Sequence, residues 1–184
     1  AISLLHNFTF GQWVQQTSGV SAGLTEVRFI NQNTGWVCGN GGTILKTTNG
    51  GLNWVTQNSG VPSKPLRDIQ PIDSNLVYCV GWFETILKST DGGSSWFAVR
   101  NGLDGVGKNY IGMYFINSNT GWISGQGSYV LRTTNGGINW SSILSNSIYD
   151  LRGVEFINDI VISVGHYGEL LKSTNNGLNW NSMR

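Results

Sequence analysis

The chain of 184 residues is 39% hydrophobic, 11% aromatic and 11% charged, and its formal net charge at pH 7 is +1. This composition is typical of a folded domain and excludes the charge-rich, aromatic-poor class of disordered proteins. A net charge near zero provides no field that attracts nucleic acid, so no nucleic-acid partner is expected, and no apolar run reaches the roughly 20 residues that span a bilayer.

Residues 1–23 are expected to contain an extra outer strand. The segment GQWVQQTSG around Trp13 matches LNWVTQNSG around Trp54, where a later strand is expected. The opening residues, AISLLHNFTF, lack the basic region and long apolar stretch of a signal peptide.

Four repeats follow, at residues 24–58, 66–100, 110–144 and 151–184. Trp54, Trp96, Trp140 and Trp180 recur about every 40 residues, and self-similarity at this period indicates an array of supersecondary units. Each repeat contains an alternating strand, a GWVCG-type strand, a TILKT-type strand and a strand that begins at the Trp. Four antiparallel strands in about 41 residues are typical of a blade, so the sequence predicts an all-β β-propeller with four four-stranded blades.

The turn before each of these Trp residues has nearly the same sequence: TTNGGLNW, STDGGSSW, TTNGGINW and STNNGLNW. Its glycine permits positive φ, its Asn or Asp can hydrogen-bond to nearby backbone, and its Trp is expected to enter the interface between blades. The structural residues of the four turns are Asn49, Gly51 and Trp54; Asp91, Gly93 and Trp96; Asn135, Gly137 and Trp140; and Asn175, Gly177 and Trp180.

These turns resemble the Asp-box, or bacterial neuraminidase repeat. The wider unit, TGWVCGNGGTILKTTNGGLNW at residues 34–54, is similar to the photosystem II stability and assembly factor family. The resemblance implies a propeller fold and export to the periplasm or the cell exterior. That family is implied to have about seven blades. The four repeats therefore leave open a piece of a longer ring, a compact ring, or a homo-oligomer joined at open strand edges.

The candidate binding residues lie where the repeats differ. The turn between the second and third strands contains Trp82, Phe83 and Glu84 in one repeat and His166 and Tyr167 in another, and loops on a rigid scaffold commonly carry function. Arg67 and Arg152 occupy one position of the first strand and would face a common environment, suited to a carboxylate or other anion. The alternatives are packing of the aromatic residues on a neighbouring loop, local pairing of the arginines with Asp68 and Asp150, and a hydrogen-bonded surface role for His166.

The chain carries no recognisable catalytic motif. Its ten acidic residues do not recur as the carboxylate pair of a glycosidase, and neither Cys38 nor Cys79 has a second ligand at zinc spacing, so no enzyme, metal or cofactor is expected. Two buried free thiols are favoured over a bridge. The preferred interpretation is a non-catalytic scaffold that binds a protein. The alternatives are a carbohydrate-binding propeller and a self-assembling structural subunit.

Overall fold

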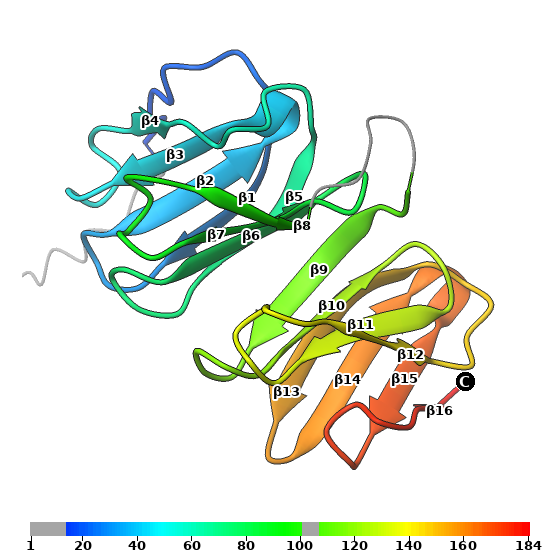
Figure 1. Ribbon diagram of the computed structural model, residues 1–184. Helices are drawn as coiled ribbons and strands as arrows, with labels where there is room; N and C mark the ends of the chain where they lie inside the picture. Colours follow the sequence, from blue (N-terminus) through cyan, green and yellow to red (C-terminus); the bar gives the residue numbers. More distant parts are fainter. Residues whose placement is uncertain (1–13, 101–106) are drawn as a thin grey trace, which may run out of the picture.

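The computed structural model describes residues 14–100 and 107–184, and in these ranges the chain forms four antiparallel sheets of four strands (Figure 1). In each sheet the strands pair in chain order, as in a propeller blade. Blade 1 contains β1 (Leu24–Phe29), β2 (Gly35–Gly39), β3 (Ile44–Thr47) and β4 (Val55–Gln57), and blade 2 contains β5 (Leu66–Pro71), β6 (Val77–Gly81), β7 (Ile86–Ser89) and β8 (Phe97–Arg100). Blade 3 contains β9 (Tyr110–Phe115), β10 (Gly121–Gly125), β11 (Tyr129–Thr133) and β12 (Ser141–Leu144), and blade 4 contains β13 (Leu151–Ile157), β14 (Ile160–Gly165), β15 (Leu170–Ser173) and β16 (Asn181–Ser182).

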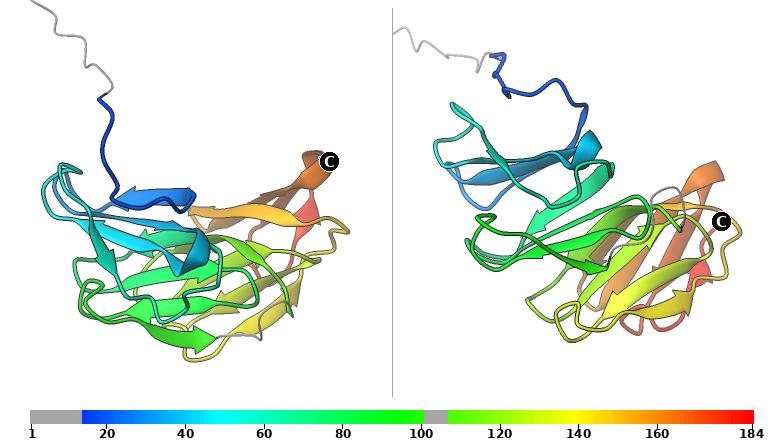
Figure 2. Two further views of the ribbon diagram at one scale, coloured as in Figure 1. Left: turned by 90° about the horizontal axis from the view of Figure 1, so that it is seen from above. Right: turned by 45° about the horizontal axis from the view of Figure 1, so that its top comes forward.

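The four-bladed, all-β architecture predicted from the repeats is confirmed. The first strands of successive blades lie beside one another, β1 against β5, β5 against β9, and β9 against β13. Figure 2 shows the blades following one another from blade 1, in blue and cyan, to blade 4, in orange and red. Blades 1 and 4 lie at opposite ends of an open arc (Figure 1).

The apolar core is divided among the three blade interfaces. One cluster, around Trp36, lies between blades 1 and 2, a second, around Tyr78, between blades 2 and 3, and a third, around Trp122, between blades 3 and 4. Cys38 and Cys79 are both free and buried in the first of these clusters. The hydrophobic stabilisation of the arc therefore comes from contacts between neighbouring blades.

Three of the four turn tryptophans pack where the sequence places them. Trp96, Trp140 and Trp180 each pack against the cluster formed with the preceding blade. The expectation is wrong for Trp54, which is half-buried and contacts Phe29 of its own blade, with ring centroids 6.0 Å apart. The other three tryptophans pack against a preceding blade, whereas blade 1 is the first blade among the described residues.

The repeated turns are closed by their own side chains. In blade 1, Asn49 Oδ1 accepts a hydrogen bond from the backbone N–H of Asn53 at 2.9 Å, and Thr47 Oγ1 accepts one from the N–H of Gly51 at 3.0 Å. The other turns repeat both bonds from Asp91, Asn135 and Asn175 and from Ser89, Thr133 and Ser173. Positive φ holds at Gly51, Gly93, Gly137 and Gly177. An amide oxygen performs the same task as a carboxylate, so Asn replaces Asp in three turns without changing the backbone.

Each interface is also held by polar contacts, here called latches. Trp36 Nε1 and Lys46 Nζ of blade 1 both donate to the carbonyl oxygen of Gly92 in the blade 2 turn, at 3.2 and 2.7 Å. The latch is repeated from Tyr78 and Lys88 to the carbonyl of Gly136, and from Trp122 to the carbonyl of Asn176. A polar contact at a fixed repeat position sets the angle between blades, which apolar packing alone does not specify.

The expected outer strand in residues 1–23 is described only from residue 14 onward. The residues that match β4, 14–16, are described and form no strand, and neither do residues 17–23, so in this part the expectation is wrong. The strands of each blade fall within one of the four sequence repeats. Over the described ranges, no helix combines the length and apolar character needed to cross a membrane.

Candidate functional site

Each first strand begins with a β-bulge that turns one side chain away from the regular alternation. The register of the pair β5–β6 shifts between Leu66 and Asp68, so Arg67 is the extra residue. The facing residue is Gly81, where a Cβ would lie 2.3 Å from the carbonyl oxygen of Pro65, so only glycine fits. The equivalent extra residues of the other blades are Thr25, Ile111 and Arg152.

The first bulge arginine is oriented by the next turn of its own blade. The Arg67 guanidinium lies over the ring of Trp82, with Cζ 4.5 Å from the ring centroid. The backbone N–H of Trp82 donates to the backbone carbonyl of Pro65 at 2.9 Å, which fixes the start of the turn beside the bulge. A cation–π contact of this kind is worth about 0.5 to 2 kcal/mol and restricts the rotamers of both side chains.

The turn after Trp82 adopts a backbone that normally requires glycine. Phe83 and Glu84 have φ of 58° and 57°, where the equivalent turn of blade 1 has Gly41 and Gly42. The following loop holds the turn in place, because the Glu84 N–H donates to the carbonyl of Lys108 at 2.8 Å. Strain of about 1 kcal/mol or more at each non-glycine residue persists only where the surroundings enforce it, and such residues cluster at functional sites.

The second bulge arginine meets a different partner at the same place. Arg152 Nε donates to His166 Nε2 at 2.6 Å, and the backbone N–H of His166 donates to the backbone carbonyl of Asp150 at 3.1 Å. The next residue, Tyr167, has φ of 55° and is 74% exposed. Its ring lies 5.0 Å from that of Tyr149, so this end of blade 4 presents a pair of aromatic rings beside an arginine.

The predicted site residues therefore come together as two assemblies, Arg67 with residues 82–84 and Arg152 with residues 166–167. The carboxylates proposed as local partners of the arginines have other hydrogen bonds. Asp150 Oδ1 accepts from the N–H of Gly127 at 3.1 Å, and Asp68 Oδ2 accepts from the N–H of Met113 at 2.7 Å.

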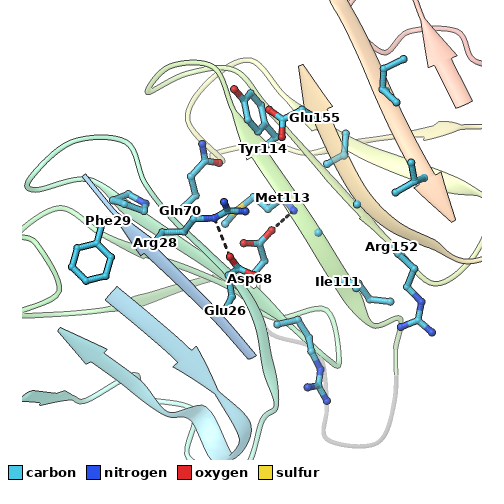
Figure 3. Close-up of a pocket in the computed structure, with 17 residues that line it drawn as sticks. Glu26, Arg28, Phe29, Asp68, Gln70, Ile111, Met113, Tyr114, Arg152 and Glu155 are labelled. Carbon is cyan, nitrogen blue, oxygen red and sulfur yellow. Dashed lines mark hydrogen bonds and ion pairs between the residues drawn. The ribbon is translucent and has the colours of Figure 1, made fainter. Parts of the chain in front are cut away.

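Both arginines line one cavity of about 520 Å³, walled by the first strands of all four blades (Figure 3). Among the lining residues that the sequence analysis did not single out are Arg28, Gln70, Tyr114 and Glu155. They occupy one repeat position, three residues after the bulge, on β1, β5, β9 and β13. A position that carries a polar or charged side chain, or a tyrosine hydroxyl, in all four copies was the signal that could have found them.

The cavity contains charges of both signs that are already partly engaged. Glu26 Oε1 pairs with Arg28 Nε at 3.1 Å, and Gln70 bridges to β9 by accepting from the Phe115 N–H at 2.7 Å and donating to its carbonyl at 3.0 Å. Burial, reinforced by a hydrogen bond and the charge of Glu155, raises the pKa of Tyr114.

Asp68 is the most perturbed group in the cavity. Its side chain is 8% exposed, and burial raises its pKa to about 6, against the opposing effect of the Met113 N–H. Figure 3 shows its carboxylate directed at Met113, with Glu26 and Arg28 alongside. Within the described ranges, no group of three His, Cys, Asp or Glu residues is placed to bind a metal ion.

Comparison with known proteins assigns the chain to a family. The family described as Photosynthesis system II assembly factor YCF48 matches residues 5–100 and 61–148. No curated protein sequence matches the chain.

Solved structures show the same fold at low sequence identity. YCF48 bound to D1 peptide is 18% identical with a TM-score of 0.72, over 92% of this chain and 55% of that one. YCF48 from Cyanidioschyzon merolae is 18% identical with a TM-score of 0.71, over 94% and 59%. The GH74 enzyme of Niastella koreensis is 17% identical with a TM-score of 0.67, over 87% and 30%. The chain thus spans less than two thirds of both YCF48 structures, and by its family match it belongs to the photosystem II assembly factor YCF48 family.

Proposed function

We propose that the chain is a non-catalytic scaffold that binds a segment of a partner protein along the inner-strand cavity. The observation that carries the proposal is the placement of Arg67 and Arg152. Both project from the same bulge position, both line the cavity, and each is oriented by a side chain of the neighbouring turn, Trp82 or His166. A guanidinium that is already oriented loses little side-chain entropy when it takes up a carboxylate or a backbone carbonyl of a partner.

Two further considerations support a protein partner. One solved structure with the same fold is described as YCF48 bound to D1 peptide, so a propeller of this type can hold a peptide. Glu26 and Asp68, two of the carboxylates in the cavity, are engaged by Arg28 and by the Met113 N–H, which does not favour the carboxylate pair of a glycosidase. The family resemblance also supports our proposal that the protein acts in the periplasm or outside the cell.

A selected peptide provides the test. Peptides that bind the wild-type chain are selected from a random library, and their affinity is measured by fluorescence anisotropy for Trp82→Ala and Arg67→Ala. We expect both variants to bind at least about ten-fold more weakly, because truncation of an aromatic or Arg anchor commonly removes 2 kcal/mol or more. Ile138→Ala is the matched control, since Ile138 is 77% exposed in a repeated turn at the other end of blade 3.

Unchanged affinity in both Trp82→Ala and Arg67→Ala would remove this face as the binding site. Circular dichroism of the variants separates loss of binding from loss of fold. Neither side chain belongs to the three interface clusters, so both variants are expected to fold.

Carbohydrate binding is the second candidate, and the exposed ring of Tyr167, which lies beside the half-buried Tyr149, favours it. Aromatic faces of this kind can stack on the apolar face of a sugar ring. A glycan array with the wild-type chain and Tyr167→Ala tests it. Sugar hits that disappear in the variant would replace the protein-binding proposal, whereas an array without hits would leave the peptide test to decide.

Self-assembly is favoured by a different observation. Leu24 and Val27 of blade 1 are 44% and 50% exposed, whereas the equivalent Leu66 and Ile69 of blade 2 are fully buried against blade 1. The matching occupant for this face is blade 4 of a second copy, because the three internal interfaces repeat the same packing. Light scattering over a concentration series should then show a dimer that Val27→Asp abolishes, and a concentration-independent monomer would exclude this function.

A further inference from the structure

One oxygen of Asp68 has no hydrogen-bond partner in the part of the chain that the structure describes. Oδ2 accepts from the Met113 N–H at 2.7 Å, but Oδ1 is buried and unpaired. Buried acceptors are nearly always satisfied, because leaving one unpaired costs the free energy of a lost hydrogen bond. Asp68 lines the inner-strand cavity, so a ligand that bonds Oδ1 would approach from the cavity and displace the side-chain atoms that cover this oxygen.

A structural role for Asp68 explains only its first oxygen. Two residues along the same strand, Gln70 makes the corresponding bridge to β9 with a neutral amide and uses both of its polar atoms. A neutral amide is therefore sufficient to join β5 to β9. A buried carboxylate at position 68 costs more desolvation free energy than an amide would, and it leaves the acceptor Oδ1 without a hydrogen bond.

A second carboxylate strengthens the negative potential at this point. Glu26 of β1 occupies the same repeat position as Asp68 of β5, lines the same cavity, and its charge contributes to raising the pKa of Asp68. Arg28 pairs with Glu26, and its charge also acts on Asp68, so the two carboxylates share one cation and together keep a net negative charge. At neutral pH, this wall therefore favours a cation.

We infer that Asp68 and Glu26 form a subsite for a primary ammonium group, namely a lysine side chain of the bound partner segment. The inference rests on the proposed peptide-binding function and names the side chain that the segment inserts. A guanidinium suits this wall less well, because Oδ2 of Asp68 already accepts a hydrogen bond from Met113, which leaves Oδ1 as the one oxygen of Asp68 without a bond. An ammonium group is a compact charge with three donors, so it can serve Asp68 Oδ1 and a Glu26 oxygen together.

The Met113 amide provides a direct probe, because its N–H donates to the carboxylate in question. Nα-acetyl-lysine methylamide is titrated into ¹⁵N-labelled wild-type chain, and the shift of the Met113 resonance is followed. We expect a saturable shift, and we expect the Nε-acetylated derivative, which has no positive charge, to give none. Equal shifts from both derivatives, or no shift from either, would overturn the inference.

Asp68→Asn is the decisive variant, because an amide oxygen retains the Met113 hydrogen bond but carries no charge. We expect lysine-derivative affinity to fall by about ten-fold or more, as for loss of a charge-assisted hydrogen bond. Glu26→Gln should weaken binding to a smaller extent. Asp150→Asn is the matched control, because Asp150 bonds a backbone N–H outside the cavity lining, and its affinity should equal that of the wild type. Unchanged affinity in Asp68→Asn would reject the subsite.

The pH dependence gives an independent check. Asp68 becomes neutral as the pH falls through about 6, so affinity for the lysine derivative should decrease over that range. The other charged groups that line the cavity are Glu26 and Arg28 on β1, Arg67 on β5, and Arg152 and Glu155 on β13, and Cys79 of β6 interacts electrostatically with Asp68.

The small-molecule titration also separates this inference from the proposed function. If selected peptides bind in a Trp82-dependent way but the lysine derivative does not, only the subsite is rejected. If the lysine derivative binds but no peptide can be selected, the subsite stands and the protein-binding proposal fails.

Discussion

Arg152 donates from Nε to Nε2 of His166 across 2.6 Å, so an imidazole holds the guanidinium of the last blade in position. In blade 2 the equivalent Arg67 is held by the ring face of Trp82. Two unlike side chains thus perform one task at the same repeat position. What the two blades share is an oriented arginine at the edge of the cavity, although the side chains that orient it differ.

Replacement of Arg152 by lysine tests whether orientation or charge is the important property. Lysine retains the positive charge but lacks the planar fork that can bond His166 and a ligand together. We expect Arg152→Lys to weaken binding of a selected peptide several-fold while the free energy of unfolding stays within about 0.5 kcal/mol of the wild type. Anisotropy and urea denaturation measure the two quantities, and full affinity in the variant would show that charge is sufficient.

Tyr167→Gly should stabilise the chain. Tyr167 has φ of 55°, whereas blade 1 has Gly41 at this position, and the exposed ring makes few contacts that offset the strain. The expected gain is about 1 kcal/mol, because release of left-handed strain exceeds the entropy cost of glycine. Tyr167→Ala keeps the unfavourable φ and should show no gain. A stabilised glycine variant that also loses ligand binding would show that the strain is retained for function.

Gly81→Ala should be severely destabilising. A Cβ at this position would lie 2.3 Å from the backbone carbonyl of Pro65, which cannot move without disturbing the bulge at Arg67. We expect a loss of about 3 kcal/mol or more in urea denaturation. Gly153→Ala is the control, since its nearest contact is Val164 Cγ2 at 3.4 Å, and it should lose less than about 1 kcal/mol. Similar losses for both variants would contradict this explanation of the bulge.

Asp68 should make the chain more stable in weak acid than at neutral pH. Its pKa is about 6 in the folded chain against an ordinary value of 3.8, so the folded state binds the proton more tightly. The free energy of unfolding contributed by this group therefore rises as the pH falls from about 7 to about 4, by roughly 3 kcal/mol in total.

Urea denaturation of the wild type and of Asp68→Asn at several pH values isolates this contribution. The difference between the two should grow in favour of the wild type as the pH falls. Asp91 acts in the opposite direction but at lower pH, because hydrogen bonds from Ser95 lower its pKa to about 2. A pH-independent difference between wild type and variant would refute the assignment to Asp68.

The two cysteines should be unreactive in the folded chain. Both lie in the core between blades 1 and 2, and burial raises the pKa of the Cys79 thiol. Thiolate is the reactive form, so maleimide labelling should follow global unfolding across a urea series, with a mass increase of two labels. Labelling well below the unfolding midpoint would show that the first interface opens separately.

The sequence predicted the blades because the repeat encodes them four times over. Turn residues such as Asn49 and Gly51 act within a few residues of themselves, so their roles can be read locally. The pairing of Arg67 with Trp82 could not be predicted in this way. It depends on a bulge that re-aims one side chain, and a bulge is invisible in the alternation of polar and apolar residues.

The incomplete burial of Trp54 and the hydrogen bonding of Asp68 could not be predicted from the sequence either, for a different reason. Each depends on which element lies opposite: within the described residues no blade comes before blade 1 to cover Trp54, and the Met113 amide of β9 lies opposite Asp68. The polar position shared by Arg28, Gln70, Tyr114 and Glu155 could have been found, since a repeat allows equivalent positions to be compared.

The latches between blades give the array a polarity. Each runs from the second strand of one blade, joined in blades 1 and 2 by a lysine of the third strand, to the turn of the next, so a blade has one donating side and one accepting side. Blades can therefore be stacked in only one sense, and a reversed blade would oppose carbonyl to carbonyl. On blade 4 the aromatic donor position is occupied by Ile162, whose side chain has no polar hydrogen. Any neighbour that joins the donating side of blade 4 meets a junction with fewer polar contacts, which is better suited to exchange than to permanent attachment.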